Sequence, residues 1–135
     1  MSERIVVCND QTGKQKLRDF VSLSAPLVSA ITNLTESSTI TLNADYLHEY
    51  IVIGTSSMGG MSANSNLFGN SNPGAGKRVT LIGNSNVSPV FISKRNLVSS
   101  KQMYLKSDAN LTLGASLTVV FIPSLDAYVE ESRSI

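Results

Sequence analysis

From residue 39 onward, short runs of β-branched and aromatic residues alternate with clusters of turn-forming residues. Such runs are typical of strands, and several of the breaks between them are short enough for hairpins. Eight short strands in so small a domain favour a sandwich or a barrel. We therefore predict an all-β domain over residues 39–135, an antiparallel, jelly-roll-like β-sandwich. Its predicted strands are Thr39–Asn43, Glu49–Gly54, Arg78–Ile82, Val90–Ser93, Gln102–Lys106, Asn110–Leu113, Leu117–Ile122 and Ala127–Ser132.

Residues 1–38 have a different pattern, with charged residues followed by spaced apolar ones. The apolar spacing is helix-like, but Pro26 cannot lie inside a helix, and the β-branched residues of this segment are weak helix formers. We predict a short N-terminal arm, partly helical or extended, that serves as an attachment segment. Its apolar positions are Leu23, Leu27, Val28, Ile31 and Leu34.

The one long segment without a strand pattern, Thr55–Lys77, is rich in Gly, Ser, Asn and Met. A loop of this length in a compact domain is usually either functional or mobile. We take it as a candidate exposed binding loop. The candidate binding residues are Met58, Met61, Asn66, Asn70 and Asn72.

The chain is poor in charge and rich in uncharged polar residues. Charged residues make up 16% of the sequence, against roughly 25% in an ordinary soluble domain, and the net charge is +1. Such a surface is either covered by copies of the same subunit or tolerates being close to neutral. The basic residues are spread along the chain and form no cluster, so we do not expect nucleic acid as a partner.

The reactive residues of the chain do not assemble a catalytic, cofactor or metal site. Cys8 is the single cysteine and His48 the single histidine, too few for an intrachain disulfide or a transition-metal site. The segment Pro73–Arg78 lacks the residues and the following helix of a phosphate-binding loop. No apolar run is long enough for a membrane span. We predict a protein that is not an enzyme and does not insert into a membrane.

Three parts of the C-terminal half carry a family pattern. They are Gly76–Ile82, then Leu111–Leu113 with Leu117–Phe121, and finally Tyr128–Arg133, which reads aromatic-x-Glu-x-Ser-Arg. Together they resemble the C-terminal tip domains of bacteriophage tail spikes and fibres, over a little under half of the chain. The family commonly carries Trp where this chain has Tyr128.

The resemblance implies a homotrimer of β-sandwich protomers that caps a shaft, or a head-fibre or capsid-decoration subunit built on the same domain. It implies a place in the virion after synthesis in the host cytoplasm. The implied partners are further copies of the chain, another virion protein docked through residues 1–38, and a glycan of the host surface. The glycan-cleaving activity of such spikes is not carried over.

The same resemblance implies that Tyr128, Glu130 and Arg133 have structural roles in the trimer. On a regular strand, Tyr128 and Glu130 share one face with Ser132, whereas Arg133 points to the other face.

Two other functions compete with this one. A free-standing carbohydrate-binding β-sandwich needs exposed aromatic rings on which sugars stack, and the chain has no Trp, four Tyr and four Phe. The other is a hydrolase, which would need an active site that these residues do not assemble; a charge-poor β-sandwich of unrelated origin is the alternative without a specific function.

Overall fold

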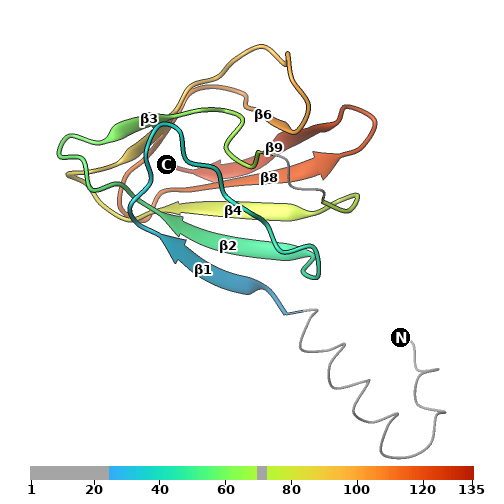
Figure 1. Ribbon diagram of the computed structural model, residues 1–135, viewed down its shortest axis with the longest axis horizontal. Helices are drawn as coiled ribbons and strands as arrows, with labels where there is room; N and C mark the ends of the chain where they lie inside the picture. Colours follow the sequence, from blue (N-terminus) through green and yellow to red (C-terminus); the bar gives the residue numbers. More distant parts are fainter. Residues whose placement is uncertain (1–24, 70–72) are drawn as a thin grey trace, which may run out of the picture.

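The computed structural model describes residues 25–69 and 73–135, which form nine strands in two sheets and no helix (Figure 1). The predicted all-β class is confirmed. The six-stranded large sheet has the order β1-β2-β4-β8-β9-β6, and the three-stranded small sheet has the order β3-β5-β7. The strands are β1 (Leu27–Ile31), β2 (His48–Ile53), β3 (Met61–Ala63), β4 (Arg78–Gly83), β5 (Val90–Ile92), β6 (Gln102–Tyr104), β7 (Ala109–Leu111), β8 (Ser116–Ile122) and β9 (Ala127–Ser134).

The N-terminal half of the fold winds in parallel coils. Strands β1, β2 and β4 run parallel in the large sheet, and β3 and β5, which follow β2 and β4 in the sequence, run parallel in the small sheet. The turn that follows β2 lies against the turn that follows β4. A Cβ added to Gly54 in the first turn would lie 3.1 Å from the Cβ of Asn84 in the second. The chain therefore passes twice from the large sheet to the small one in the same direction.

The C-terminal half closes the sheets with antiparallel strands. In the large sheet β8 pairs antiparallel with β4 and with β9, and in the small sheet β7 pairs antiparallel with β5. Strand β6 pairs parallel with β9. Both sheets are mixed, so the predicted purely antiparallel pairing is wrong. The sequence pattern finds strands but does not show which of them pair, and the long segment before β4 is the crossover that a parallel pair requires.

Seven of the eight predicted strands are present, and Thr39–Asn43 is not a strand. In that segment Ile40 is buried, and its amide donates to the carbonyl of Leu67, so the alternating apolar residues face the core without a ladder. Strand β3 lies inside Thr55–Lys77, and the same segment buries Phe68. The expected exposed loop therefore contributes part of the core.

The segment predicted as an arm contributes a strand to the large sheet. Strand β1 pairs with β2 in regular register, and Leu34, which follows it, is buried in the core. The first strand of the large sheet thus begins before residue 39. Residues 1–24 lie outside the described residues.

Alternation within the strands places the core. In β2 the side chains of Glu49, Ile51 and Ile53 are buried, whereas those of His48, Tyr50 and Val52 are half-buried on the opposite face. The inner faces of both sheets contribute to one apolar cluster. Its completely buried members include Ile53, Val79, Leu81, Val90, Ile92, Leu111, Leu117 and Val119.

Candidate functional site

The outer face of the large sheet combines apolar and polar side chains. Six half-buried apolar side chains from neighbouring strands point away from the core, and we call this surface the open face. Register places Val52 beside Ile82 and Val120 beside Val129, and the row of Tyr50, Thr80 and Thr118 lies between these two pairs. The open face is formed by Tyr50, Val52, Ile82, Val120, Ile122 and Val129.

A chain of hydrogen bonds crosses the polar part of this sheet surface. His48 Nε2 lies 2.8 Å from Thr80 Oγ1, which lies 2.8 Å from Thr118 Oγ1, and the His48 ring stacks on Tyr50. Burial lowers the pKa of His48, and the nearby Arg78 cation acts in the same direction. The imidazole is therefore uncharged at neutral pH.

The formal charges next to the His48 ring cancel. The Arg78 guanidinium donates two hydrogen bonds, of 2.9 and 2.8 Å, to the Glu131 carboxylate. These hydrogen bonds lower the pKa of Glu131 and raise that of Arg78. The outer surface of the large sheet thus combines apolar side chains with hydroxyls and an internally paired charge, and such a surface suits contact with another protein.

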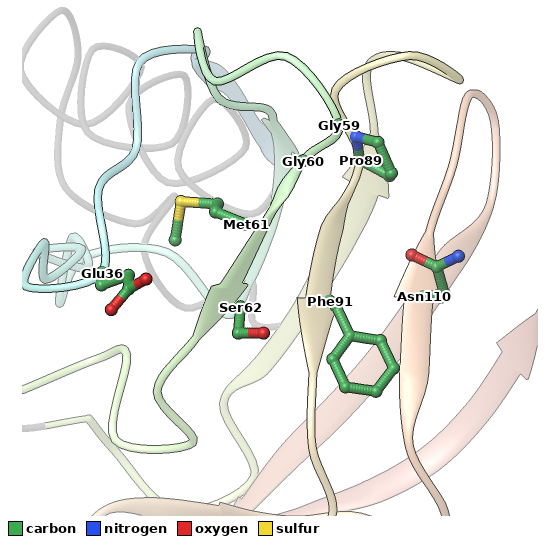
Figure 2. Close-up of a pocket in the computed structure, with 8 residues that line it drawn as sticks. All are labelled: Glu36, Gly59, Gly60, Met61, Ser62, Pro89, Phe91 and Asn110. Carbon is green, nitrogen blue, oxygen red and sulfur yellow. The ribbon is translucent and has the colours of Figure 1, made fainter.

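A second candidate site is a hollow of about 440 Å³ over the outer face of the small sheet (Figure 2). Its floor is a row of side chains in register across the three strands, Ser62 on β3, Phe91 on β5 and Asn110 on β7. Figure 2 shows Glu36 and Met61 at one side of this row. The residues lining the hollow are Glu36, Gly59, Gly60, Met61, Ser62, Pro89, Phe91 and Asn110.

The wall of the hollow depends on a glycine. Gly60 has a φ of +88°, and a Cβ there would collide with the carbonyl oxygen of Pro89. The next amide, that of Met61, donates to the same oxygen at 3.1 Å. Only glycine allows the two chain segments to approach this closely in that conformation.

The hollow offers one half-buried aromatic ring among hydrogen-bonding groups. The Phe91 ring is flanked in register by the Ser62 hydroxyl and the Asn110 carboxamide. A ligand with one apolar face and several hydroxyls fits this chemistry, because the ring covers the face while the polar groups bond the hydroxyls.

The predicted binding residues do not gather at one place. Met61 lines the hollow, and Met58 is 89% exposed. Asn66 is half-buried, and its backbone amide donates to Asn64 Oδ1. Asn70 and Asn72 lie outside the described residues. Sequence reasoning missed Phe91, although its position between two apolar neighbours in a short strand predicts that it faces away from them.

Tyr128 is an internal residue of the described fold. Its side chain is completely buried, and its ring packs against those of Phe68 and Phe121 at centroid distances of 4.6 and 5.2 Å. Burial raises the pKa of the phenol, and the negative charge of Glu49 adds to the effect. Within a single chain, Tyr128 therefore contributes to the packing of the core.

Glu130 and Arg133 bind each other, contrary to the expected alternation. The Arg133 guanidinium donates to both Glu130 carboxylate oxygens, at 2.6 and 2.7 Å. The pairing register shifts between Thr118 and Val119, so that Val119 opposes Glu130 but Thr118 opposes Ser132. This bulge adds one residue to β9, and Arg133 consequently lies on the same side as Glu130.

The pair fixes the turn between β6 and β7. Arg133 also donates to the carbonyls of Ser107 and Asp108, and Glu130 accepts from the Lys106 amide at 2.8 Å. The hydrogen bond from Arg133 is the largest cause that lowers the pKa of Glu130, against the opposing effect of burial. One buried carboxylate thus joins the large sheet to the chain segment that enters the small sheet.

A second buried ion pair links the residue before β4 to β2. Lys77 Nζ lies 2.7 Å from Glu49 Oε2, and each side chain is 3% exposed. The Lys77 ammonium also donates to the carbonyls of Asn43 and Tyr46. Lys77, which lies in the segment compared with a phosphate-binding loop, therefore donates to three acceptors within the protein and holds the structure together at this point.

Among residues 25–69 and 73–135, no three His, Cys, Asp or Glu side chains come close enough to hold a metal ion. The same residues contain no helix that is long and apolar enough to cross a membrane. Comparison of the chain with family models, with curated proteins and with solved structures finds no match.

Proposed function

We propose that the chain is a structural subunit of a bacteriophage virion, a β-sandwich protomer of a trimeric fibre, spike or capsid decoration used for attachment or host-surface binding. The observation that carries the proposal is the open face, six apolar side chains on the outside of a large sheet. A second copy that covers them removes apolar area from water, and the low charge of the chain lowers the cost of that contact.

The family-like segments support the same proposal. Gly76–Ile82 falls mainly on β4, Leu117–Phe121 on β8 and Tyr128–Arg133 on β9, which are three neighbouring strands of the large sheet. The remaining segment, Leu111–Leu113, begins at the end of β7 in the small sheet, so most of the resemblance lies on neighbouring strands of the large sheet. In the proposed assembly, the open face contacts other copies, while residues 1–38 attach the subunit to another virion protein.

Sedimentation or light scattering of the full chain tests the trimer. Wild-type protein should have three times the subunit mass of 14.4 kDa at micromolar concentration. The Ile82→Lys variant should dissociate, because a lysine on the open face would be buried without a partner.

The matched control is Leu113→Lys, since Leu113 is 62% exposed and lies outside the strands β2, β4, β8 and β9 that form the open face. Both variants should keep the circular dichroism of a folded β protein. A monomeric wild type, or equal dissociation of the two variants, contradicts the proposal.

The hollow favours a second candidate function, that of a carbohydrate-binding module. Its Phe91 ring, the Asn110 amide and the Ser62 hydroxyl match a sugar with an apolar face and several hydroxyls. Phe91→Ala should weaken the binding of neutral oligosaccharides from a test panel by about 10-fold or more in affinity. Val87→Ala, at an exposed apolar site outside the hollow, is the control. Wild-type protein that binds no member of the panel contradicts this function.

A further inference from the structure

The described sheets end in four edge strands, and one of them has the fewest of the features that block further pairing. Strands β3, β6 and β7 have three residues each, and β6 lies between Lys101 and Lys106. Strand β1 is longer, with five residues, and reads Leu-Val-Ser-Ala-Ile; it contains no charge and no bulge, and Pro26 lies just before its first residue. Short strands, charges, prolines and bulges are the usual protection of an edge. Among the described strands, β1 therefore pairs on one side alone, and its outer edge has the fewest of these features (Figure 1).

The core is also incompletely covered at this edge. Register aligns Leu27, Ser29 and Ile31 of β1 with three buried residues of β2. In β1 itself, Leu27 and Ile31 are only half-buried and Ser29 is exposed. The end coil of a stacked array buries its inward side chains fully only when something covers it.

The sequence of β1 is nearly symmetric about Ser29. If two copies of β1 pair antiparallel around a two-fold axis through Ser29, Leu27 of each copy lies opposite Ile31 of the other. In the same pairing Val28 lies opposite Ala30. Side chains keep their faces in such a pair, so the half-buried apolar residues of the two copies cover each other.

We propose that β1 is a contact between two copies of this chain, in which the two β1 edges pair antiparallel about Ser29 and join the two large sheets. The contact is distinct from the open face and links trimers, or single subunits, side by side. Five residues on each side bury much less than the roughly 1,200 Å² of a stable interface, so the contact is weak and concentration-dependent.

Disulfide trapping detects a weak contact of defined register. In antiparallel pairs, directly opposed Cα atoms lie roughly 4.5 or 5.5 Å apart, within the range of a disulfide. The Ser29→Cys variant, made in a Cys8→Ser background, should form a covalent dimer under mild oxidation. The control is Ser100→Cys in the same background, because Ser100 is exposed next to β6 at the opposite edge. Pairing should make the first at least about 10-fold faster, since it raises the local thiol concentration.

Charge exchange tests the register. Val28 is 69% exposed and Ala30 is exposed, so both positions accept charged side chains without loss of the subunit fold. Added to Ser29→Cys, Val28→Lys with Ala30→Lys should suppress the covalent dimer, and so should Val28→Glu with Ala30→Glu. An equimolar mixture of the two proteins should restore it, as a mixed dimer, because position 28 of one opposes position 30 of the other.

Three results overturn the inference: trapping of Ser29→Cys at the rate of Ser100→Cys, trapping insensitive to both charge pairs, or a mixture that stays unlinked. The Ile82→Lys substitution separates this contact from the trimer. In the Ser29→Cys protein, Ile82→Lys should abolish the trimer and leave the covalent dimer. A trimer without trapping refutes the β1 contact alone, and trapping without a trimer refutes the trimer alone.

Discussion

At the scale of single residues, the buried carboxylates carry much of the specificity of this fold. Glu49 and Glu130 are both almost completely buried, and each accepts hydrogen bonds from one cation and from one backbone amide. A buried ion pair adds little net stability over an apolar pair of the same shape, but removal of one partner leaves an uncompensated charge. The two carboxylates therefore penalise any arrangement that separates them from Lys77 or Arg133.

The Glu130 and Arg133 pair gives a pH-dependent prediction. The folded-state pKa of Glu130 is lowered below its ordinary value of 4.5, so the pair stabilises the fold above about pH 4.5, and this stabilisation is lost as pH falls through the folded-state pKa. Arg133→Met should lower the free energy of unfolding by about 3 kcal/mol at pH 7. The difference from wild type should shrink as the pH falls through the folded-state pKa of Glu130, because a protonated carboxyl no longer forms an ion pair with the guanidinium.

Urea denaturation at pH 7 and pH 3 measures this difference. Glu131→Gln is the control, because Glu131 is exposed and its partner Arg78 is also exposed, so its removal should change stability little. A loss in Arg133→Met that is equal at both pH values would show that the guanidinium acts by packing and not through the carboxylate.

At the scale of elements, the last residue of β4 determines how closely the two sheets join. Gly83 donates to the carbonyl of Ala115 at 2.8 Å, and its own carbonyl accepts from Gly114 at 3.1 Å. A Cβ at Gly83 would overlap the backbone oxygens of Leu111 and Thr112, which lie at and just after the end of β7. Backbone cannot move aside as a flexible side chain can.

Gly83→Ala should therefore destabilise the fold by roughly 2 kcal/mol or more, in the range of overpacked cores. Gly74→Ala is the matched control, because nothing lies within 4 Å of the added methyl group and its φ is not in the left-handed region. Thermal unfolding followed by circular dichroism compares them. Equal melting temperatures for the two variants would exclude the close approach of β4 to the β7 turn.

The strands themselves were largely predictable, and their partners were not. Alternation and β-branched residues identify β2, β4, β8 and β9, because each buries one face. Strand β1 escaped prediction because its apolar residues also fit a helical spacing. Strand β3 has three residues within a glycine- and asparagine-rich segment, too few for a periodic signal.

The same limit applies to the candidate sites. Alternation was sufficient to place Phe91 on an outer face, but nothing local predicts that Ser62 and Asn110 flank it, since three separate strands supply them. The face of Arg133 was predicted wrongly because one bulge residue reverses the alternation. Patterns with a period of two are reliable only as far as the first irregularity of the ladder.

At the scale of the whole molecule, the two halves divide the structural tasks. The parallel coils of β1 to β5 build the open edge at β1 and, together with Asn110 of β7, the hollow over the small sheet, whereas β8 and β9 complete the open face and the aromatic packing around Tyr128. The molecule thus presents three surfaces of different chemistry: the open face of the large sheet, the edge of strand β1, and the hollow with its hydrogen-bonding groups.

The pairing of β4 with β8 also constrains how the chain is synthesised. When β4 has been synthesised, more than thirty residues remain to be added before its partner β8 begins, and β6 has no large-sheet neighbour until β9 follows. A half-made chain therefore contains a parallel ribbon of β1, β2 and β4 in which β4 still lacks its second partner. Nascent chains of this kind are prone to aggregate, so the yield of soluble subunit should depend on translation speed and on chaperones that shield β2 and β4 until the last two strands arrive.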